Sequence, residues 1–390
     1  MMTVGSFACW PKNVVSGPGA IGSLGAMVKD MGKTNVMVFT DSGMKEFPVI
    51  KNVLATLHDS GLTANLFSEI GPNPTEEMVH NAVAFMHEVK PEVLICIGGG
   101  SPIDAAKAAN VVYTHGGGVG DYNVAMGGIS KITPILLPLI AVPTTAGTGT
   151  EVTFVGVITD TKNETKYGVV SPLLIPDIAV LDPEITVTMP PTLTAFTGID
   201  ALTHCIESYT ATGGFAPAEA LALQAIAMIS RSLRVAVKDG HNLTAREEML
   251  LASMMAGTAF SLNGLGACHA MAHQLSAVFG MPHGLANAIL LPKVMEFNIL
   301  ACPQKFAAIA QAMGANVHTM SEEDAAYASL TLVEQLCADV GVPLYLDDAG
   351  ATKDKIPALV EKALLDNPLT TNPREATASD LIALFEKSFR

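Results

Sequence analysis

The chain has 390 residues, 49% of them apolar, which is enough to bury two cores rather than one. Its net charge of −15 disfavours nucleic acid and anionic membranes as partners. Six cysteines without CxxC spacing, and an N-terminus without a basic segment followed by an apolar run, predict a reduced, cytoplasmic protein that does not span a membrane.

The first half of the chain alternates short apolar runs with helical patterns. We expect buried strands at residues 35–40, 64–67, 93–97 and 139–142, and helices at residues 76–90 and 102–112. After Asp182 the chain is punctuated by prolines and then lacks strand-like runs. This pattern predicts an α/β domain with a parallel sheet over residues 1–185 and an all-helical domain over residues 186–390.

A glycine cluster lies between an expected strand and an expected helix. The run ICIGGGSPIDAAK, residues 95–107, lets the backbone approach a phosphate, with Ser101 predicted as the helix N-cap and Pro102 as the first helical residue. The run departs from the GxGxxG pattern, and a turn without a ligand explains it equally well when it is taken alone.

Two further features point to a nucleotide. The run PTTAGTGTEVT, residues 143–153, follows another strand and offers Thr144, Thr145 and Thr148 as donors, although a polar turn is an alternative. Asp41 ends the strand NVMVFTD, where a carboxylate can accept from ribose hydroxyls and repel a 2′-phosphate. Together these loops predict NAD rather than NADP.

The helical half concentrates ligands for a metal. In GIDALTHCIESY, Asp200 and His204 stand four residues apart on one helix face. The run HAMAHQLSAVFGMPHG adds His269, His273 and His283. One carboxylate with imidazoles suits Fe²⁺ or Zn²⁺, whereas hydrogen-bonded core histidines are the alternative. The residues alone do not say which of the five are ligands.

These segments, in this order along the chain, resemble the iron-dependent, or group III, alcohol dehydrogenase family. The similarity is carried by GGGSPIDAAK, PTTAGTGTEVT, GIDALTHCIESY and HAMAHQLSAVFGMPHGLANAILLPKVMEFN, and is greatest to the 1,3-propanediol dehydrogenase and lactaldehyde reductase branches. The resemblance implies a dehydroquinate-synthase-like fold with a dinucleotide-binding α/β domain, a helical domain, an active site in the cleft between them, and a homo-oligomer.

The resemblance also assigns roles to residues. It implies that Asp200, His204, His269 and His283 bind the metal, with Fe²⁺ favoured over Zn²⁺, and that His273 is a candidate for proton transfer. The residues that it implies contact NAD are Asp41, Asn73, Gly99, Gly100, Ser101, Thr144, Thr145, Thr148 and Lys166.

The expected reaction is the interconversion of a small primary alcohol or diol and its aldehyde with NAD(H). Relatives often carry a polar residue where this chain has Val155, and with Phe154 and Phe260 this predicts an apolar substrate pocket. The alternative is an NAD- and metal-using lyase or cyclase of the dehydroquinate-synthase type, which needs cationic groups that the helical half hardly offers near the expected ligands. A non-catalytic NAD-binding protein is a further alternative.

Overall fold

The computed structural model describes residues 10–163 and 165–390. Its contacts divide the chain into two compact units. The first, here called the α/β unit, runs to Thr145 and resumes over Thr150–Thr186. The second, the helical unit, contains Ala146–Gly149 and Val187–Arg390.

The α/β unit is built on a six-stranded parallel sheet with the order β1-β8-β5-β4-β2-β3, and a separate antiparallel hairpin pairs β6 with β7. The strands are β1 (Asn13–Ser16), β2 (Asn35–Asp41), β3 (Thr63–Ile70), β4 (Val93–Gly98), β5 (Leu139–Pro143), β6 (Val155–Asp160), β7 (Thr165–Val170) and β8 (Ile178–Leu181). The four predicted strands correspond to β2, β3, β4 and β5, and the parallel sheet is confirmed.

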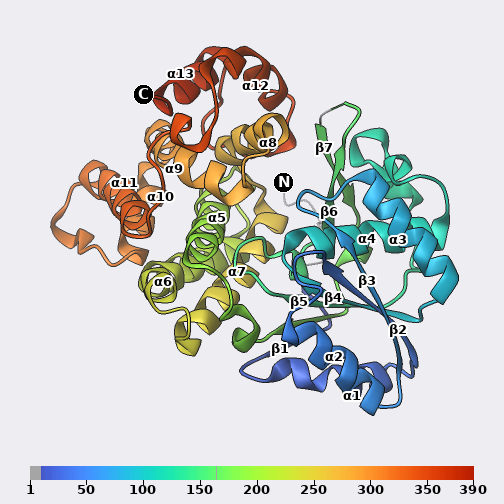
Figure 1. The fold of residues 1–390 in the computed structure, drawn as a ribbon. Helices are drawn as coiled ribbons and strands as arrows, with labels where there is room; N and C mark the ends of the chain where they lie inside the picture. The colour runs from blue at the N-terminus through green and yellow to red at the C-terminus, as the bar shows by residue number, and fades with distance from the viewer. Residues whose placement is uncertain (1–9, 164) are drawn as a thin grey trace. The chain divides into compact units, whose positions relative to one another are not determined.

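Helices cover both faces of this sheet. Helices α1 (Leu24–Asp30) and α2 (Pro48–Asp59) lie on one face, and α3 (Glu76–Val89) and α4 (Gly100–His115) lie on the other (Figure 1). Alternate residues of β2 serve the two cores: Val36 and Val38 pack with α1 and α2, whereas Met37 and Phe39 pack with α3 and α4. Burial on both faces explains why the middle of β2 is a continuous apolar run.

Helix α4 begins earlier than predicted. Gly99 occupies the N-cap position in an extended conformation, and no side chain caps the helix, so the prediction of Ser101 as the N-cap was wrong. The carboxylate of Asp104, which would complete a capping box, instead accepts hydrogen bonds from Thr150 Oγ1 at 2.5 Å and the Val157 backbone N–H at 3.2 Å. The first turn of α4 therefore keeps its backbone N–H groups uncapped by a side chain.

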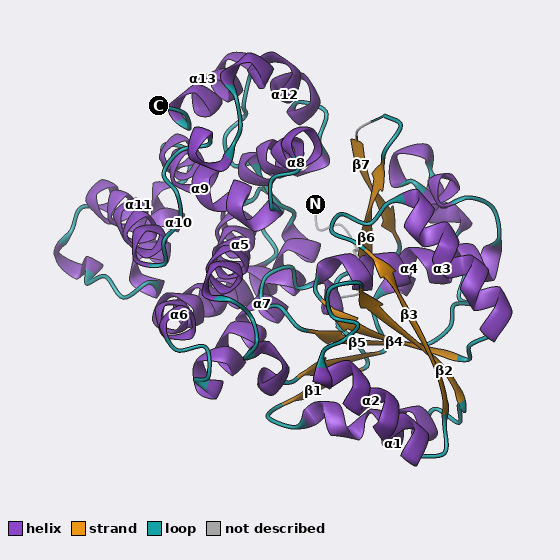
Figure 2. Cartoon of the chain, viewed as in Figure 1, coloured by secondary structure: helices purple, strands orange, loops and turns teal. Residues whose placement is uncertain are grey.

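The helical unit contains no strand among its described residues, as predicted (Figure 2). Its helices are α5 (Pro191–Thr210), α6 (Ala216–Lys238), α7 (Leu243–Asn263), α8 (Ala267–Phe279), α9 (His283–Ile299), α10 (Pro303–Ala312), α11 (Glu322–Asp339), α12 (Ile356–Ala363) and α13 (Ala378–Lys387). Helix α5 is central, because α6, α7, α9 and α10 all pack against it. Every residue of α5 from Gly198 to Thr210 is buried.

Two features bear on the expected environment of the protein. By length and composition alone, α6 could cross a membrane, and so could the bent pair α7 and α8 if the two helices formed one span. Helices buried in a protein core meet the same criteria of length and composition. Both α6 and α7 pack against α5. The five cysteines among the described residues are all free and buried, and Cys9 lies outside the described residues.

Candidate functional site

Four predicted ligands meet inside the helical unit. Asp200 and His204 come from α5, His269 from α8, and His283 is the first residue of α9. One ligand atom from each lies within 4.8 Å of all the others. Asp200 Oδ1 is 3.6 Å from His283 Nε2 and 3.8 Å from His269 Nε2. Ligands about 2.1 Å from one ion stand roughly 3–4 Å apart, so this cluster fits a single divalent cation.

The protonation states also suit a metal. Burial is the main cause that lowers the pKa of His204, and Asp200 opposes it. Burial likewise holds the pKa of His269 well below its ordinary value, and the neighbouring histidines lower it further. The buried imidazoles are therefore neutral at physiological pH, which is the form that coordinates a metal.

Glu207, which sequence reasoning did not single out, holds one of the four residues in place. It lies on α5 three residues after His204 and is 3% exposed. Its carboxylate lies 2.5 Å from His269 Nδ1 and accepts from the Cys268 backbone N–H at 2.7 Å. Burial raises the pKa of Glu207 to about 8. Because this carboxyl engages Nδ1, the Nε2 of His269 is left for the cluster.

Asn287 is a second contact of the cluster that the sequence analysis missed. It lies one turn after His283, donates to Asp200 Oδ1 at 2.7 Å, and its Nδ2 is 3.1 Å from the Nε2 of both His269 and His283. The start of α9 can approach α5 because residue 284 is glycine: a Cβ there would lie 2.5 Å from the Phe196 carbonyl oxygen.

His273 lies beside the cluster. Its ring stacks on His283 with a centroid distance of 5.3 Å and meets His269 edge-on at 6.0 Å. Its Nδ1 lies 2.8 Å from Asp366 Oδ2. Phe260 stacks on another member of the cluster, His204, at a centroid distance of 4.6 Å. Asp366 follows α12 in a segment without helical periodicity, and no signal in the sequence pointed to it.

Predicted nucleotide residues converge at the carboxyl ends of three adjacent strands, β5, β4 and β2. Thr144 donates its backbone N–H to the Gly98 carbonyl oxygen at 2.9 Å. A Cβ at Gly99 would lie 3.3 Å from Thr145 Oγ1, and one at Gly98 would lie 3.5 Å from Asp41 Oδ2. The loop before Gly100 and Ser101 thus lies between the Asp41 carboxylate and the Thr145 hydroxyl.

The remaining predicted NAD contacts lie in two different places, Asn73 and Lys166 in the α/β unit and Thr148 in the helical unit. Lys166 Nζ on β7 donates to Asn73 Oδ1 at 2.8 Å, which brings this predicted pair together. Thr148 belongs to the segment Ala146–Gly149, which groups with the helical unit. Gly149 has a φ of +62°, and a Cβ there would lie 2.6 Å from Gly257 Cα of α7. This glycine permits close packing of the segment against a helix.

The predicted pocket residues are divided between the two units. Phe154 and Val155 stand at the start of β6 in the α/β unit, and Phe260 belongs to α7 in the helical unit. The carbonyl of Val155 accepts a hydrogen bond from the buried Lys107 Nζ at 2.9 Å.

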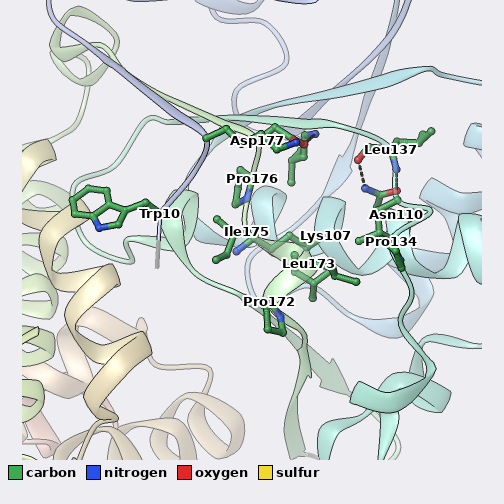
Figure 3. A pocket seen from close by; sticks show the side chains of 14 residues that line it. Trp10, Lys107, Asn110, Pro134, Leu137, Pro172, Leu173, Ile175, Pro176 and Asp177 are labelled. Carbon is green, nitrogen blue, oxygen red and sulfur yellow. Dashed lines mark hydrogen bonds and ion pairs between the residues drawn. The ribbon is translucent and has the colours of Figure 1, made fainter. Parts of the chain in front are cut away.

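A cavity of about 300 Å³ in the α/β unit is a different feature (Figure 3). Most of its lining residues are apolar, and its polar side chains are engaged: Asn110 exchanges two hydrogen bonds with the Leu137 backbone, and Lys12 pairs with Asp177. No predicted site residue lines it, so it does not belong to the candidate site.

Comparisons with known proteins cover nearly the whole chain. The model of the iron-containing alcohol dehydrogenase family matches residues 11–183, and the model of the C-terminal part of the Fe-containing alcohol dehydrogenase family matches residues 194–389. The 1,3-propanediol dehydrogenase of Klebsiella pneumoniae is 38% identical over 375 residues, which are 96% of either chain. The lactaldehyde reductase of Escherichia coli (strain K12) is 39% identical over 373 residues, 96% of this chain and 97% of that one.

Two further similarities agree with these. The NAD-dependent methanol dehydrogenase of Bacillus methanolicus is 34% identical over 378 residues, 97% of this chain and 98% of that one. A crystal structure of 1,3-propanediol oxidoreductase superimposes with a TM-score of 0.95 at 38% identity, covering 98% of this chain and 99% of that one. The resemblance deduced from the four sequence segments is confirmed, and the chain belongs to the iron-containing alcohol dehydrogenase family.

Proposed function

We propose that the protein is a metal-dependent oxidoreductase that interconverts a small primary alcohol or diol and its aldehyde with NAD(H). The observation that carries this proposal is the convergence of one carboxylate and three imidazoles in a chain of this family. The relatives reported above are named as dehydrogenases and a reductase, which supports this reaction over the lyase or cyclase alternative.

The proposed metal ligands are Asp200, His204, His269 and His283. The family favours Fe²⁺, and the same donor set is chemically suited to Zn²⁺. When bound, the metal supplies Lewis acidity at the substrate oxygen, and NAD accepts or returns the hydride. Glu207 orients His269, and Asn287 holds the Asp200 carboxylate by a hydrogen bond.

The proposed NAD site uses the uncapped first turn of α4, whose backbone N–H groups can receive a pyrophosphate. Asp41 would accept from the ribose hydroxyls and disfavour a 2′-phosphate. The proposed contacts are Asp41, Asn73, Gly99, Gly100, Ser101, Thr144, Thr145, Thr148 and Lys166.

His273 is proposed to exchange the substrate proton. It contacts the cluster through ring stacking, is not one of the four proposed ligands, and has a side chain that is 23% exposed. In alcohol oxidation it would accept the hydroxyl proton, and in aldehyde reduction it would return it. Phe154, Val155 and Phe260 are proposed to line the substrate pocket with apolar groups, which suits short, weakly polar alcohols.

We further propose that the protein works in the cytoplasm as a homo-oligomer, with a domain boundary between residues 185 and 186, one residue before the division of the two units between Thr186 and Val187. Its partners would be small alcohols and aldehydes rather than nucleic acid or membranes. The net charge of −15 and the free, buried cysteines support this environment.

The test is anaerobic purification and metal analysis, followed by assays of short alcohols, diols and aldehydes with NAD(H) and NADP(H). We expect metal-dependent turnover and a preference for NAD. His269→Ala should lose both metal and activity, whereas His58→Ala, whose side chain is 88% exposed, should keep both. Absence of metal-dependent turnover on every substrate would reject the proposal, and a preference for NADP would reject the role of Asp41.

A further inference from the structure

We propose that Asp366 is the positioning residue that selects the orientation and the tautomer of His273. This inference rests on the proposed function, because it takes His273 as the group that exchanges the substrate proton. It adds a residue from the segment after α12 to the metal cluster and His273, which are built on α5, α8 and α9.

The geometry assigns the proton on one ring nitrogen. Asp366 Oδ2 lies 2.8 Å from His273 Nδ1 and accepts from Gln274 Nε2 at 3.0 Å. A carboxylate can only accept, so Nδ1 carries the hydrogen and Nε2 is left with its lone pair. Gln274 Nε2 also donates to the Ala270 carbonyl oxygen at 3.1 Å, and this second hydrogen bond fixes the side-chain amide that donates to Asp366 Oδ2.

Ring stacking alone does not select this orientation. The contacts with His283, at an interplanar angle of 21°, and with His269, at 72°, define the plane of the His273 ring. A 180° rotation about χ2 preserves that plane while it exchanges the positions of nitrogen and carbon atoms. The hydrogen bond to Asp366 therefore distinguishes the two orientations.

Asp366 is itself held by a segment that does not depend on His273. Residues 366–372 pack against α8 and are fixed at their far end by Asn372, whose Oδ1 accepts from the Ala267 backbone N–H at 3.0 Å. The Asn372 and Asn298 amides exchange two buried hydrogen bonds of 3.0 and 2.8 Å. Thr371 Oγ1 donates to the Leu265 carbonyl oxygen at 2.7 Å. These contacts anchor the segment to the start of α8 without involving His273.

This arrangement has a chemical consequence for the proposed reaction. With NAD bound as the hydride acceptor, the O–H electron pair of the alcohol would become the second bond of the carbonyl group, and the proton would move to His273 Nε2. The ring then carries a positive charge, which the adjacent carboxylate stabilises. In aldehyde reduction the same proton returns to the oxygen. Asp366 acts only through His273.

The first test is a double-mutant cycle on the metal-loaded enzyme with Asp366→Ala, His273→Asn and the double variant. We expect D366A to lower kcat by about 10- to 100-fold, with the metal content and the KM for NAD unchanged. In the H273N background, the same substitution should change kcat by less than about 3-fold. Asp366→Asn should lie between D366A and the wild type, because an amide oxygen still accepts from Nδ1 but carries no charge. The neighbouring exposed Asn367→Ala should match the wild type.

The second readout does not depend on activity. In the zinc-loaded protein with ¹⁵N-labelled histidine, NMR should show His273 protonated at Nδ1 in the wild type and shifted from that tautomer in D366A. Three outcomes would each overturn the inference. The first is a wild-type kcat in D366A while H273N is slow, and the second is a kcat of the double variant that equals the product of the two single losses. The third is a His273 tautomer that is unchanged in D366A. An inactive wild type would reject the proposed function instead, and the NMR comparison would still decide the role of Asp366.

Discussion

In its ionised form, above its pKa of about 8, Glu207 serves two donors with a single carboxylate, the His269 ring and the Cys268 backbone. The substitution Glu207→Gln leaves one acceptor oxygen for two buried donors. Leaving a buried donor unpaired costs about 1–3 kcal/mol, so the free energy of unfolding of the metal-free protein should fall by that amount. Metal affinity should fall about 10- to 100-fold because His269 is less firmly oriented.

Urea unfolding and competition with a chelator measure these two effects of Glu207→Gln. The control is Glu361→Gln at an exposed position of α12, which should change neither quantity. Wild-type metal affinity in the Glu207 variant would show that this residue serves only as a helix contact.

Glu151 predicts a pH dependence of stability. It is 1% exposed, and its Oε1 has no hydrogen-bond partner among the described residues. Burial raises the pKa of Glu151 from 4.5 to about 7, and Lys107 opposes this. Because the folded pKa lies above the unfolded one, its contribution to stability is complete below pH 4.5 and is lost as the pH rises through 7.

The substitution Glu151→Gln removes this titration. The stability of the variant relative to the wild type should therefore rise by up to about 3 kcal/mol between pH 4.5 and 7.5. Urea unfolding at several pH values in this window measures the difference. For the exposed Glu184→Gln, the difference in unfolding free energy from the wild type should not change with pH. A difference that is also independent of pH for E151Q would contradict the raised pKa of Glu151.

At the scale of single residues, the spacing of side chains along a helix decided which site residues could be predicted from the sequence. The pair Asp200 and His204 stands four residues apart on one helix, and His269 and His273 repeat that spacing, so their shared faces are readable from the sequence. Glu207 was readable in principle, since it lies three residues after His204. Asp366 was not, because the hydrogen bond to His273 spans 93 residues and depends on the path of the chain after α12.

Among the elements, α4 is tied to the hairpin region by a buried lysine. Lys107 is 1% exposed, and its Nζ donates to the carbonyl and hydroxyl oxygens of Thr150 and Thr153 and to the Val155 carbonyl, over 2.7–3.0 Å. The ammonium therefore fixes residues 150–155 on α4.

The substitution Lys107→Met should leave several of these oxygens buried without a donor. We expect a loss of at least about 3 kcal/mol in the free energy of unfolding and faster amide hydrogen exchange over residues 150–157. Urea unfolding and hydrogen-exchange mass spectrometry measure the two effects. The exposed Lys29→Met is the matched control. Wild-type rates of amide hydrogen exchange over residues 150–157 in Lys107→Met would mean that contacts other than those of Lys107 hold this region.

Three of the four predicted strands, β2, β4 and β5, have apolar runs buried on both faces, whereas the edge strand β3 is only partly buried. The sequence analysis missed β1 and β8, which have four residues each, and the hairpin of β6 and β7, where partly exposed residues such as Lys166 and Tyr167 interrupt the pattern. The start of α4 was misplaced because a serine followed by proline is a strong local signal. Tertiary contacts of Asp104 with Thr150 and Val157 prevailed over that signal.

For the whole molecule, the change from strands to helices along the chain was readable from composition and proline punctuation. The assignment of Ala146–Gly149 to the helical unit was not readable, because it depends on contacts. A Cβ at Gly147 would lie 2.8 Å from the Thr197 side chain, and Gly149 approaches Gly257 equally closely. Close packing against α5 and α7 is a tertiary property that a run of glycines and threonines does not reveal.

The division into units predicts that the two proposed binding functions can be lost separately. All four proposed metal ligands belong to the helical unit, whereas Asp41 and the glycine loop belong to the α/β unit. His269→Ala should abolish metal binding, and with it the rise in Tm that a bound ligand produces, while the Kd for NADH remains within about 3-fold of the wild type. Asp41→Ala should do the reverse, with weakened NADH binding and an unchanged metal content. Metal analysis, thermal unfolding with and without metal, and NADH fluorescence titration measure the four quantities. If His269→Ala also abolished NADH binding while remaining folded, the metal and nucleotide sites would depend on each other for their formation.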